Sequence, residues 1–416
     1  MDKLIIEGPS KLSGTVKISR AKNAYLPILA AVLLNDKPVH LKNLPELRDI
    51  RTMLTLLQNL GVRIDQRDNV TTLDPSNLSN HMATYELVKT MRASIFVLGP
   101  LLARLGKARV SLPGGCAIGT RPIDIHLENL KKMGAEIIIE AGYVEATKRN
   151  LQAVHLPLKF PSVGATENLM MAAVFTPGTT VIENAAREPE IEDLANFINA
   201  MGGKVEGAGT SKIQITGVNE LREVEYEAIG DRIEAATYVM AALMTKSEVK
   251  VVGINPIHLE FVIDTLRSMG ANIDTDENSI HVKPSELKPA KIETQPYPGF
   301  PTDVQAQMMA LCCVIPGNSM ITEAIFENRF MHVPELTRLG AKIELKGNTA
   351  FIEGVEELSA APVMCTDLRA SAALVVAAIT AKGRSEISRV YHIDRGYERL
   401  DQKLAGLGVR VQRTNE

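Results

Sequence analysis

Apolar residues spaced three and four apart lead into a short Leu-Gly or Met-Gly phrase at six places along the chain. In the first place Ile50, Met53 and Leu57 share one face of a predicted helix. Gly61 follows four residues later and is expected to cap this helix at its C-terminus. Alternating apolar and polar residues come next, as in residues 341–354, and such alternation predicts a β-hairpin.

The phrase returns at nearly even intervals. Its glycines are separated by 73, 68, 68, 70 and 68 residues: Gly61, Gly134, Gly202, Gly270, Gly340 and Gly408. Each copy also contains a segment that is apolar on nearly all sides, which predicts a helix buried inside its domain: residues 25–34, 94–105, 168–175, 237–244, 307–314 and 371–379. The chain therefore predicts six repeats of about 70 residues, each with a buried helix, a strand, a second helix and a hairpin.

The two ends of the chain complement each other. The sixth copy stops after one hairpin strand, within residues 409–416, and residues 2–8 resemble its missing second strand. We therefore expect the first strand to pair near the last. This closure predicts one domain of residues 21–228, with repeats 1–3, and a second of residues 1–20 plus 229–416, with repeats 4–6. A linear solenoid is the alternative, but solenoids usually carry distinct capping repeats, which this sequence lacks.

The composition narrows the class of protein. Of 416 residues, 45% are hydrophobic and 23% charged, which excludes a wholly disordered chain. The 46 Lys and Arg nearly balance the 49 Asp and Glu, which argues against nucleic-acid or membrane partners. Four Cys are too few for a disulfide-stapled secreted fold, and no targeting segment or membrane-spanning apolar run is evident. We expect a soluble cytoplasmic protein.

Polar residues stand where the six buried helices are predicted to begin: Lys22-Asn23, Arg92–Ser94, Gly164–Thr166, Asp231-Arg232, Thr302-Asp303 and Asp367–Arg369. A helix N-terminus offers unbonded N–H groups and a partial positive charge, which suit anions. Lys22, Arg92 and Arg369 cannot cap a helix, so an anion should balance them, either a protein carboxylate or a ligand. Three hydroxyl residues are expected to be ordinary N-caps: Ser94, Thr166 and Thr302.

Residues 112–122, LPGGCAIGTRP, predict a mobile surface loop because they contain three glycines and two prolines. Cys116 lies within it, close to Arg121, and a nearby cation lowers a thiol pKa and favours reactivity. An inert exposed thiol is the alternative. The remaining cysteines lie in or beside apolar runs and are expected to be packing residues: Cys312, Cys313 and Cys365.

Several familiar sites are absent from the sequence. It has no dinucleotide-binding or P-loop glycine motif, no H-E-x-x-H and no Cys/His metal spacing. His126 and His392 lack an evident partner and are interpreted as structural. The candidate chemistry rests on Arg, Lys, Asp and one Cys, which suits a doubly anionic substrate handled without a cofactor or a metal.

Nine long motifs occur together: A-K-N-A, K-T-M-R-A-S, L-P-G-G-C-A-I-G-T-R-P-I-D, F-P-S-V-G-A-T-E-N, N-A-A-R-E-P-E, F-P-T-D-V-Q-A-Q, F-E-N-R-F-M-H-V-P-E-L, T-D-L-R-A-S and Y-H-I-D-R-G-Y-E-R. In this combination the chain resembles the UDP-N-acetylglucosamine 1-carboxyvinyltransferase family of enolpyruvyl transferases, from Lys3 to about Gly408. The resemblance implies an α/β fold, a two-domain inside-out α/β barrel with three repeats per domain.

The resemblance also implies the reaction. The 3-hydroxyl of UDP-N-acetylglucosamine adds to C2 of phosphoenolpyruvate, and loss of phosphate from the tetrahedral ketal leaves an enolpyruvyl ether. This is the first committed step of bacterial peptidoglycan synthesis, and in the family domain closure excludes water. The implied partners are these two small molecules, with no cofactor, no metal, no nucleic acid and no membrane, and the chain is expected to be a monomer.

By motif position, Cys116 resembles the family's proton donor, which forms an adduct with phosphoenolpyruvate and is the target of fosfomycin. Asp303 resembles the base that faces the sugar hydroxyl. The implied phosphoenolpyruvate contacts are Lys22, Asn23, Arg121 and Arg395, of which Lys22 and Arg395 also count as catalytic. The implied contacts to UDP-N-acetylglucosamine are Asn23, Arg92, Arg121, Pro122, Ile123, Asp124, Ile125, Ser162, Val163, Gly164, Asp303 and Ile325. Further cleft residues are Arg329, Asp367 and Arg369.

Two departures from the family pattern stand out. Arg20 occupies a position, at the expected domain crossing, where the family usually has Gly, and we expect activity to survive. Some members carry a Lys directly before S-V-G, whereas here Lys159-Phe160-Pro161 precede Ser162, which puts a lysine contact to the diphosphate in doubt. The alternatives are 5-enolpyruvylshikimate-3-phosphate synthase, which lacks the Cys loop, and an inactive regulatory paralogue.

Overall fold

A computed structural model of the chain describes residues 2–89, 91–112 and 123–415. The chain divides into two compact units. Of the described residues, unit 1 contains 2–19 and 230–415, and unit 2 contains 20–112, apart from residue 90, and 123–229.

Unit 2 contains three repeats of similar make-up. The first has α1 (Lys22–Ala31), η1 (Val32–Leu34), β3 (Val39–Lys42), α2 (Arg48–Leu60), β4 (Arg63–Arg67) and β5 (Val70–Asp74). The second has β6 (Met82–Ala83), α3 (Tyr85–Val88), η2 (Arg92–Val97), α4 (Leu98–Leu105), β7 (Lys107–Ser111), α5 (Asp124–Lys132), β8 (Ala135–Glu140) and β9 (Tyr143–Lys148). The third has β10 (His155–Pro157), α6 (Val163–Ala173), β11 (Thr179–Glu183), α7 (Pro189–Ala200), β12 (Val205–Glu206) and β13 (Lys212–Thr216), and β14 (Val224–Tyr226) follows it.

Unit 1 starts with β1 (Asp2–Gly8) and β2 (Ser13–Lys17) and continues with the other three repeats. The fourth has α8 (Arg232–Met244), β15 (Glu248–Val252), η3 (Pro256–Leu259), α9 (Glu260–Ser268), β16 (Asn272–Asp276) and β17 (Ser279–Lys283). The fifth has β18 (Lys291–Glu293), η4 (Thr302–Val304), α10 (Gln305–Cys312), β19 (Asn318–Thr322), α11 (Val333–Arg338), β20 (Lys342–Lys346) and β21 (Thr349–Glu353). The sixth has β22 (Pro362–Met364), α12 (Leu368–Thr380), β23 (Gly383–Ser388), η5 (Val390–Arg395), α13 (Leu400–Gly406) and β24 (Arg410–Asn415).

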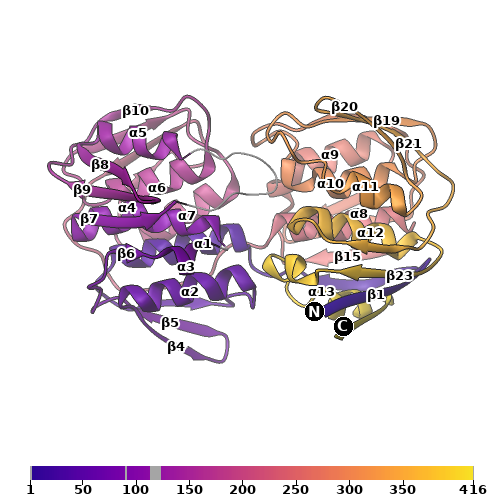
Figure 1. Cartoon of the computed structure of the whole chain (residues 1–416), viewed down its shortest axis with the longest axis horizontal. Coiled ribbons are helices and arrows are strands. Elements are labelled where there is room, and N and C mark those ends of the chain that lie inside the picture. Colours follow the sequence, from indigo (N-terminus) through magenta and orange to yellow (C-terminus); the bar gives the residue numbers. More distant parts are fainter. Residues whose placement is uncertain (1, 90, 113–122, 416) are drawn as a thin grey trace. The chain divides into compact units, whose positions relative to one another are not determined.

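The all-round apolar segments form the centre of each unit, as predicted. Every residue of α8 and α10 is buried, and α8, α10 and α12 pack against one another inside unit 1. Three four-stranded sheets surround them, and α1, α4 and α6 occupy the matching place in unit 2 (Figure 1). A helix without a polar face is stable only when neighbours cover all its sides, so these helices lie inside the sheets.

The ends of the chain pair as expected. In unit 1, β1 lies antiparallel between β23 and β24, with Ile5 opposite Gln412 on one side and Glu386 on the other. The N-terminal strand thus completes the sixth repeat, and the predicted closure is confirmed.

One element of the repeat was missed. Each sheet has an additional short edge strand that pairs in parallel with the strand after the central helix, for example β18 with β19. These edge strands are only two to five residues long, too short to show a period-two pattern. Two of these edge strands lie far along the chain from the strand they pair with: β2 pairs with β15 in unit 1, and β14 pairs with β3 in unit 2.

Candidate functional site

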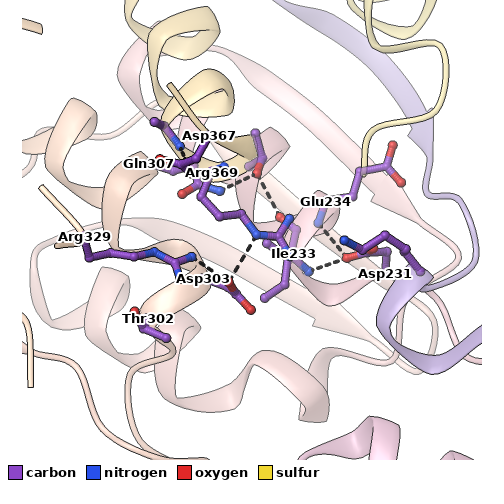
Figure 2. A network of polar contacts seen from close by, with 12 residues as sticks. Asp231, Ile233, Glu234, Thr302, Asp303, Gln307, Arg329, Asp367 and Arg369 are labelled. Atoms are coloured by element: carbon purple, nitrogen blue, oxygen red, sulfur yellow. Dashed lines mark hydrogen bonds and ion pairs between the residues drawn. The ribbon is translucent and has the colours of Figure 1, made fainter. Parts of the chain in front are cut away.

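Two of the central helices of unit 1, α8 and α12, begin with carboxylate caps. Asp231 Oδ1 accepts hydrogen bonds from the backbone N–H groups of Ile233 and Glu234 at 2.9 and 3.0 Å (Figure 2). Asp367 Oδ1 accepts from those of Arg369 and Ala370 at 2.8 and 3.1 Å. A carboxylate at this position satisfies the N–H groups and complements the positive end of the helix. The starts of α8 and α12 are therefore already occupied by protein anions.

The prediction that three hydroxyl residues are N-caps is wrong. Thr302 Oγ1 donates to Glu323 Oε2 at 2.8 Å, and Ser94 Oγ donates to the Met91 carbonyl at 2.7 Å. Thr166 lies within α6, where its hydroxyl accepts from a loop N–H, and the cap of this helix is Ser162. The helices begin a few residues away from the positions that the sequence suggested, so these hydroxyls face other partners.

Asp303 is held by two buried arginines in unit 1. Its Oδ1 lies 2.7 Å from Nη2 of Arg329 and 3.3 Å from Nε of Arg369 (Figure 2). The side chains of Arg329 and Arg369 are only 3% and 7% exposed, whereas that of Asp303 is 31% exposed. The guanidinium groups thus lie beneath the carboxylate and fix its orientation, while the carboxylate keeps access to solvent.

The charge of Arg369 is secured by its surroundings. Burial by itself would lower its pKa, but the nearby Asp303, with further contributions from Tyr397 and Asp231, raises the pKa above its ordinary value. Arg369 was expected to need an anion, and the structure gives it a protein carboxylate.

In unit 2, Lys22 is likewise paired with a protein carboxylate. It starts α1, and its Nζ lies 3.3 Å from Oδ2 of Asp49, which is in the first turn of α2. The two side chains are 10% and 5% exposed. The buried ion pair holds the lysine side chain in place. The following residue, Asn23, is half-buried.

The segment expected to face the diphosphate forms the start of α6. Ser162 Oγ accepts from the Ala165 N–H at 3.4 Å, and Val163 and Gly164 make the first turn. A Cβ on Gly164 would lie 3.3 Å from Cε1 of Phe96 and 3.4 Å from the His126 ring, so both rings lie close to this first turn. Ile123, Asp124 and Ile125 begin the neighbouring α5, which packs on α6.

Both departures from the family pattern have partners within unit 2. Arg20 places Nη2 2.7 Å from Oε1 of Glu227, which Asn43 also contacts. Lys159, largely exposed, pairs with Glu128 at 3.0 Å on the surface. Arg20 is therefore held by a carboxylate near the second segment that joins the units along the chain.

The remaining candidate residues are placed only in part. Arg395 ends η5 and is half-buried, and Ile325 follows β19 with its N–H donating to Glu323 Oε1 at 2.9 Å. Cys116, Arg121 and Pro122, together with the side chain of Arg92, lie outside the described residues.

The other cysteines are packing residues, as predicted. Cys312, Cys313 and Cys365 are fully buried, and burial raises the pKa of Cys312 and of Cys365 to about 12. Thiols of this kind stay protonated and unreactive at neutral pH.

Sequence reasoning missed two carboxylates that organise the site. Asp49 pairs with Lys22 across 27 positions in the chain, and Glu323, 3% exposed, accepts hydrogen bonds from the Thr294 and Thr302 hydroxyls. Neither residue belongs to one of the six central-helix starts or to a recognised motif. The need of buried Lys22 for an anion is the signal that could have pointed to a carboxylate. The sequence does not show that this carboxylate is Asp49, because its proximity to Lys22 depends on packing.

Two kinds of feature are absent from the part of the chain that the structure describes. It contains no group of three or more His, Cys, Asp or Glu side chains placed to hold a metal ion. It also contains no helix with the length and apolar character needed to cross a bilayer.

Comparisons with known proteins show the family of the chain. Residues 6–404 match the EPSP synthase (3-phosphoshikimate 1-carboxyvinyltransferase) family. UDP-N-acetylglucosamine 1-carboxyvinyltransferase 2 of Carboxydothermus hydrogenoformans is 53% identical and covers 100% of both chains. UDP-N-acetylglucosamine 1-carboxyvinyltransferase of Psychrobacter sp. is 52% identical, over 100% of this chain and 97% of that relative.

Solved structures share the fold at lower identity. The enolpyruvyl transferase NikO from Streptomyces tendae superposes with a TM-score of 0.90 at 24% identity, covering 100% of this chain and 99% of that one. EPSP synthase from Acinetobacter baumannii gives 0.78 at 18% identity over 100% of both chains. The predicted inside-out α/β barrel of the enolpyruvyl transferases is confirmed.

Proposed function

The chain belongs to the UDP-N-acetylglucosamine 1-carboxyvinyltransferase family, and from this premise we propose that it transfers the enolpyruvyl group of phosphoenolpyruvate to the 3-hydroxyl of UDP-N-acetylglucosamine and releases phosphate. The observation that carries the proposal is the identity of about half of all residues, over the full length, with relatives of that name. In a bacterium this reaction would start peptidoglycan synthesis.

The reaction needs three proton movements and cations that hold the negative charge of the donor. The sugar hydroxyl loses a proton as its oxygen bonds to C2 of phosphoenolpyruvate, and C3 gains a proton. The ketal then loses a proton from C3 as the C–O bond to phosphate breaks, which restores the double bond. A donor, a base and cations for the phosphate and carboxylate therefore suffice.

Asp303 is proposed as the base for the sugar hydroxyl. The ion pairs with Arg329 and Arg369 both use Oδ1, and these guanidinium groups lie on the buried side of the carboxylate. This arrangement fixes the direction in which the carboxylate faces a hydroxyl, and a fixed direction is what general-base catalysis requires first. Asp367 keeps the start of α12, and with it Arg369, in place through its cap.

Lys22 and Arg395 are proposed to bind the phosphoenolpyruvate anion, with Asn23 and Arg121. Lys22 is held by Asp49, so its ammonium group is ordered before the substrate arrives. Cys116 is proposed to protonate C3, a role that rests on its motif alone. The start of α6 at Ser162–Gly164, with residues 121–125, Arg92 and Ile325, is proposed to bind UDP-N-acetylglucosamine, because helix N–H groups suit a diphosphate.

Phosphate release from phosphoenolpyruvate tests the proposal. Release with UDP-N-acetylglucosamine as acceptor and none with shikimate-3-phosphate is expected, and the reverse result would instead support an EPSP synthase. No release with either acceptor would support an inactive regulatory relative.

A matched pair of variants tests the base. Asp303→Asn should lower kcat by about a hundredfold or more, because the amide cannot accept the hydroxyl proton. Asp274→Asn is the control, since Asp274 also pairs with a cation, Lys283, at 2.7 Å but lies on an exposed strand. Equal turnover in the two variants would remove Asp303 from the mechanism.

A further inference from the structure

A single buried carboxylate joins three segments of unit 1. Glu323 follows β19 directly and is 3% exposed. Its Oε1 accepts hydrogen bonds from the Thr294 hydroxyl at 2.8 Å and from the backbone N–H groups of Ile325 and Phe326 at 2.9 and 3.1 Å. Its Oε2 accepts from the Thr302 hydroxyl at 2.8 Å. One side chain thus connects the segment after β18, the start of η4 and the turn after β19.

The direction of these hydrogen bonds follows from the groups involved. The backbone N–H groups of Ile325 and Phe326 can only donate. Thr294 Oγ1 accepts from the Ala324 N–H at 2.9 Å, and its own proton is available for Glu323. A carboxylate accepts at both oxygens and has no proton to give, which suits four donors. Removal of the carboxylate would leave these donors without their acceptor, which is costly for the buried ones.

The backbone of Glu323 is fixed as well. Its N–H donates to the Asn348 carbonyl at 2.8 Å, and its carbonyl accepts from Asn348 Nδ2 at 3.3 Å. Asn348 lies in the turn between β20 and β21. The carboxylate therefore projects from an anchored point at the end of this sheet, and the segments that it contacts are held relative to that point.

Two of these segments carry residues that the proposed reaction uses. Thr302 is followed directly by Asp303, the proposed base, and both belong to the three-residue η4 (Figure 2). Ile325 is a proposed contact to UDP-N-acetylglucosamine. The ring centre of Phe326 lies 5.4 Å from the guanidinium carbon of Arg329, which pairs with Asp303 at 2.7 Å. Hydrogen bonds to one carboxylate thus connect the base with the turn proposed to contact the sugar nucleotide.

We propose that Glu323 is a positioning residue for the transfer reaction: its carboxylate fixes the turn at Ile325 and the base-bearing η4 relative to each other. The inference rests on the proposed function, because it assumes that Asp303 takes the proton of the sugar hydroxyl. General-base catalysis needs the hydroxyl and the base within hydrogen-bond reach, so the relative placement of the two segments affects the rate of the chemical step.

A purely structural role for a buried carboxylate is the competing explanation. Thr302→Val tests the link to η4 alone, because it removes one hydroxyl and none of the other three donors to Glu323. The matched control is Thr180→Val in unit 2. Thr180 is fully buried, and among the described residues its hydroxyl has no hydrogen-bond partner. Both variants replace a hydroxyl group by a methyl group of similar size.

Steady-state kinetics of phosphate release separate the two explanations. Thr302→Val should lower kcat about tenfold while KM for either substrate changes less than about twofold, because the orientation of the base affects the chemical step. Thr302→Ser keeps the donor and should recover most of this loss, and Thr180→Val should keep the wild-type kcat. In an Asp303→Asn background, Thr302→Val should lower kcat less than about twofold further, because the base through which it acts is already removed.

A second pair of variants distinguishes reach from charge and covers a Thr302→Val protein that does not fold. Glu323→Gln has the length to contact all four partners, since Thr302 can rotate its hydroxyl to accept from the amide. Glu323→Asp keeps the charge but is one methylene shorter, so it cannot hold both η4 and the turn. The positioning role predicts a lower kcat and a higher KM for UDP-N-acetylglucosamine in Glu323→Asp than in Glu323→Gln. Equal values or the opposite order would overturn it.

The outcomes also separate this inference from the proposed function. A wild-type protein without phosphate release refutes the proposed function, and the inference falls with it. An active wild type in which Thr302→Val matches Thr180→Val, or in which Thr302→Val costs the same factor in both backgrounds, refutes the positioning role alone.

Discussion

Acidification should destabilise unit 2 through His126. The imidazole is 6% exposed, and its Nδ1 lies 3.2 Å from the amide nitrogen of Asn168. The amide orientation is fixed, because Asn168 Oδ1 accepts from the Gly99 N–H at 2.6 Å while its nitrogen donates to the Ile95 carbonyl at 2.8 Å. Nδ1 must therefore accept the hydrogen bond from Asn168. Protonation of Nδ1 would place its N–H opposite the N–H of that amide.

The magnitude follows from the pKa. Burial, opposed in part by Asp124, lowers the pKa of His126 from 6.5 to about 4. The imidazole is therefore protonated below about pH 6.5 in the unfolded chain, but only below about pH 4 in the folded protein. Because the unfolded state binds this proton first, the free energy of unfolding decreases as the pH falls. At about 1.36 kcal/mol per pKa unit the full gap is worth roughly 3.4 kcal/mol, of which about 2 kcal/mol lies between pH 7 and pH 5.

Urea unfolding at pH 7 and pH 5, followed by circular dichroism, measures this loss. His126→Gln keeps an acceptor for Asn168 but cannot titrate, so the drop in unfolding free energy should be about 2 kcal/mol smaller than in the wild type. His155→Gln, at a position where the side chain is 55% exposed, is the control and should retain the wild-type drop. The same pH dependence in all three proteins would refute the reasoning.

Three further outcomes are expected. Gly354→Ala should lower the unfolding free energy by about 3 kcal/mol or more, since its Cβ would lie 1.7 Å from the Ile315 carbonyl oxygen. Gly406→Ala is the control, because a Cβ there would have nothing within 4 Å. Similar melting temperatures for the two variants would contradict this expectation. Arg20→Gly should change turnover less than about tenfold, because a partly exposed ion pair contributes about 1 kcal/mol or less, and rescue of a nearly inactive parent would overturn it. Fosfomycin should label the wild type, and Cys116→Ser should abolish the labelling in mass spectra, since the other three thiols are buried; undiminished labelling would place the reactive thiol elsewhere.

Local patterns predicted much of the fold. The glycine-capped amphipathic helices and the apolar helices were recognisable because a helix period needs only ten or so residues to appear, and 68 to 73 residues separate the repeats. The pairing of β1 with β24 was predictable because the sixth hairpin lacked a strand and the N-terminus supplied one. The parallel edge strands were missed, since segments of two to five residues, such as Met82-Ala83, are too short to show a period.

The candidate site divides in the same way. Lys22, Asp303 and Arg369 stand at predicted helix starts and were recognised by charge and motif. Their pairings were not: Asp49 comes from another element, and the contact of Arg329 with Asp303 depends on packing, although Arg329 itself was named by its motif.

The amino-acid sequence alone thus determined the repeats, their helices, the closure of the chain and the residue types available for catalysis, because all of these depend on neighbours a few positions apart or on a periodic pattern. Only the tertiary structure decided which carboxylate balances each buried cation, since these pairs join residues from 26 to 66 positions apart, as with Asp303 and its two arginines. Burial then makes such pairings decisive, because a buried charge without its partner costs far more than the same charge in water.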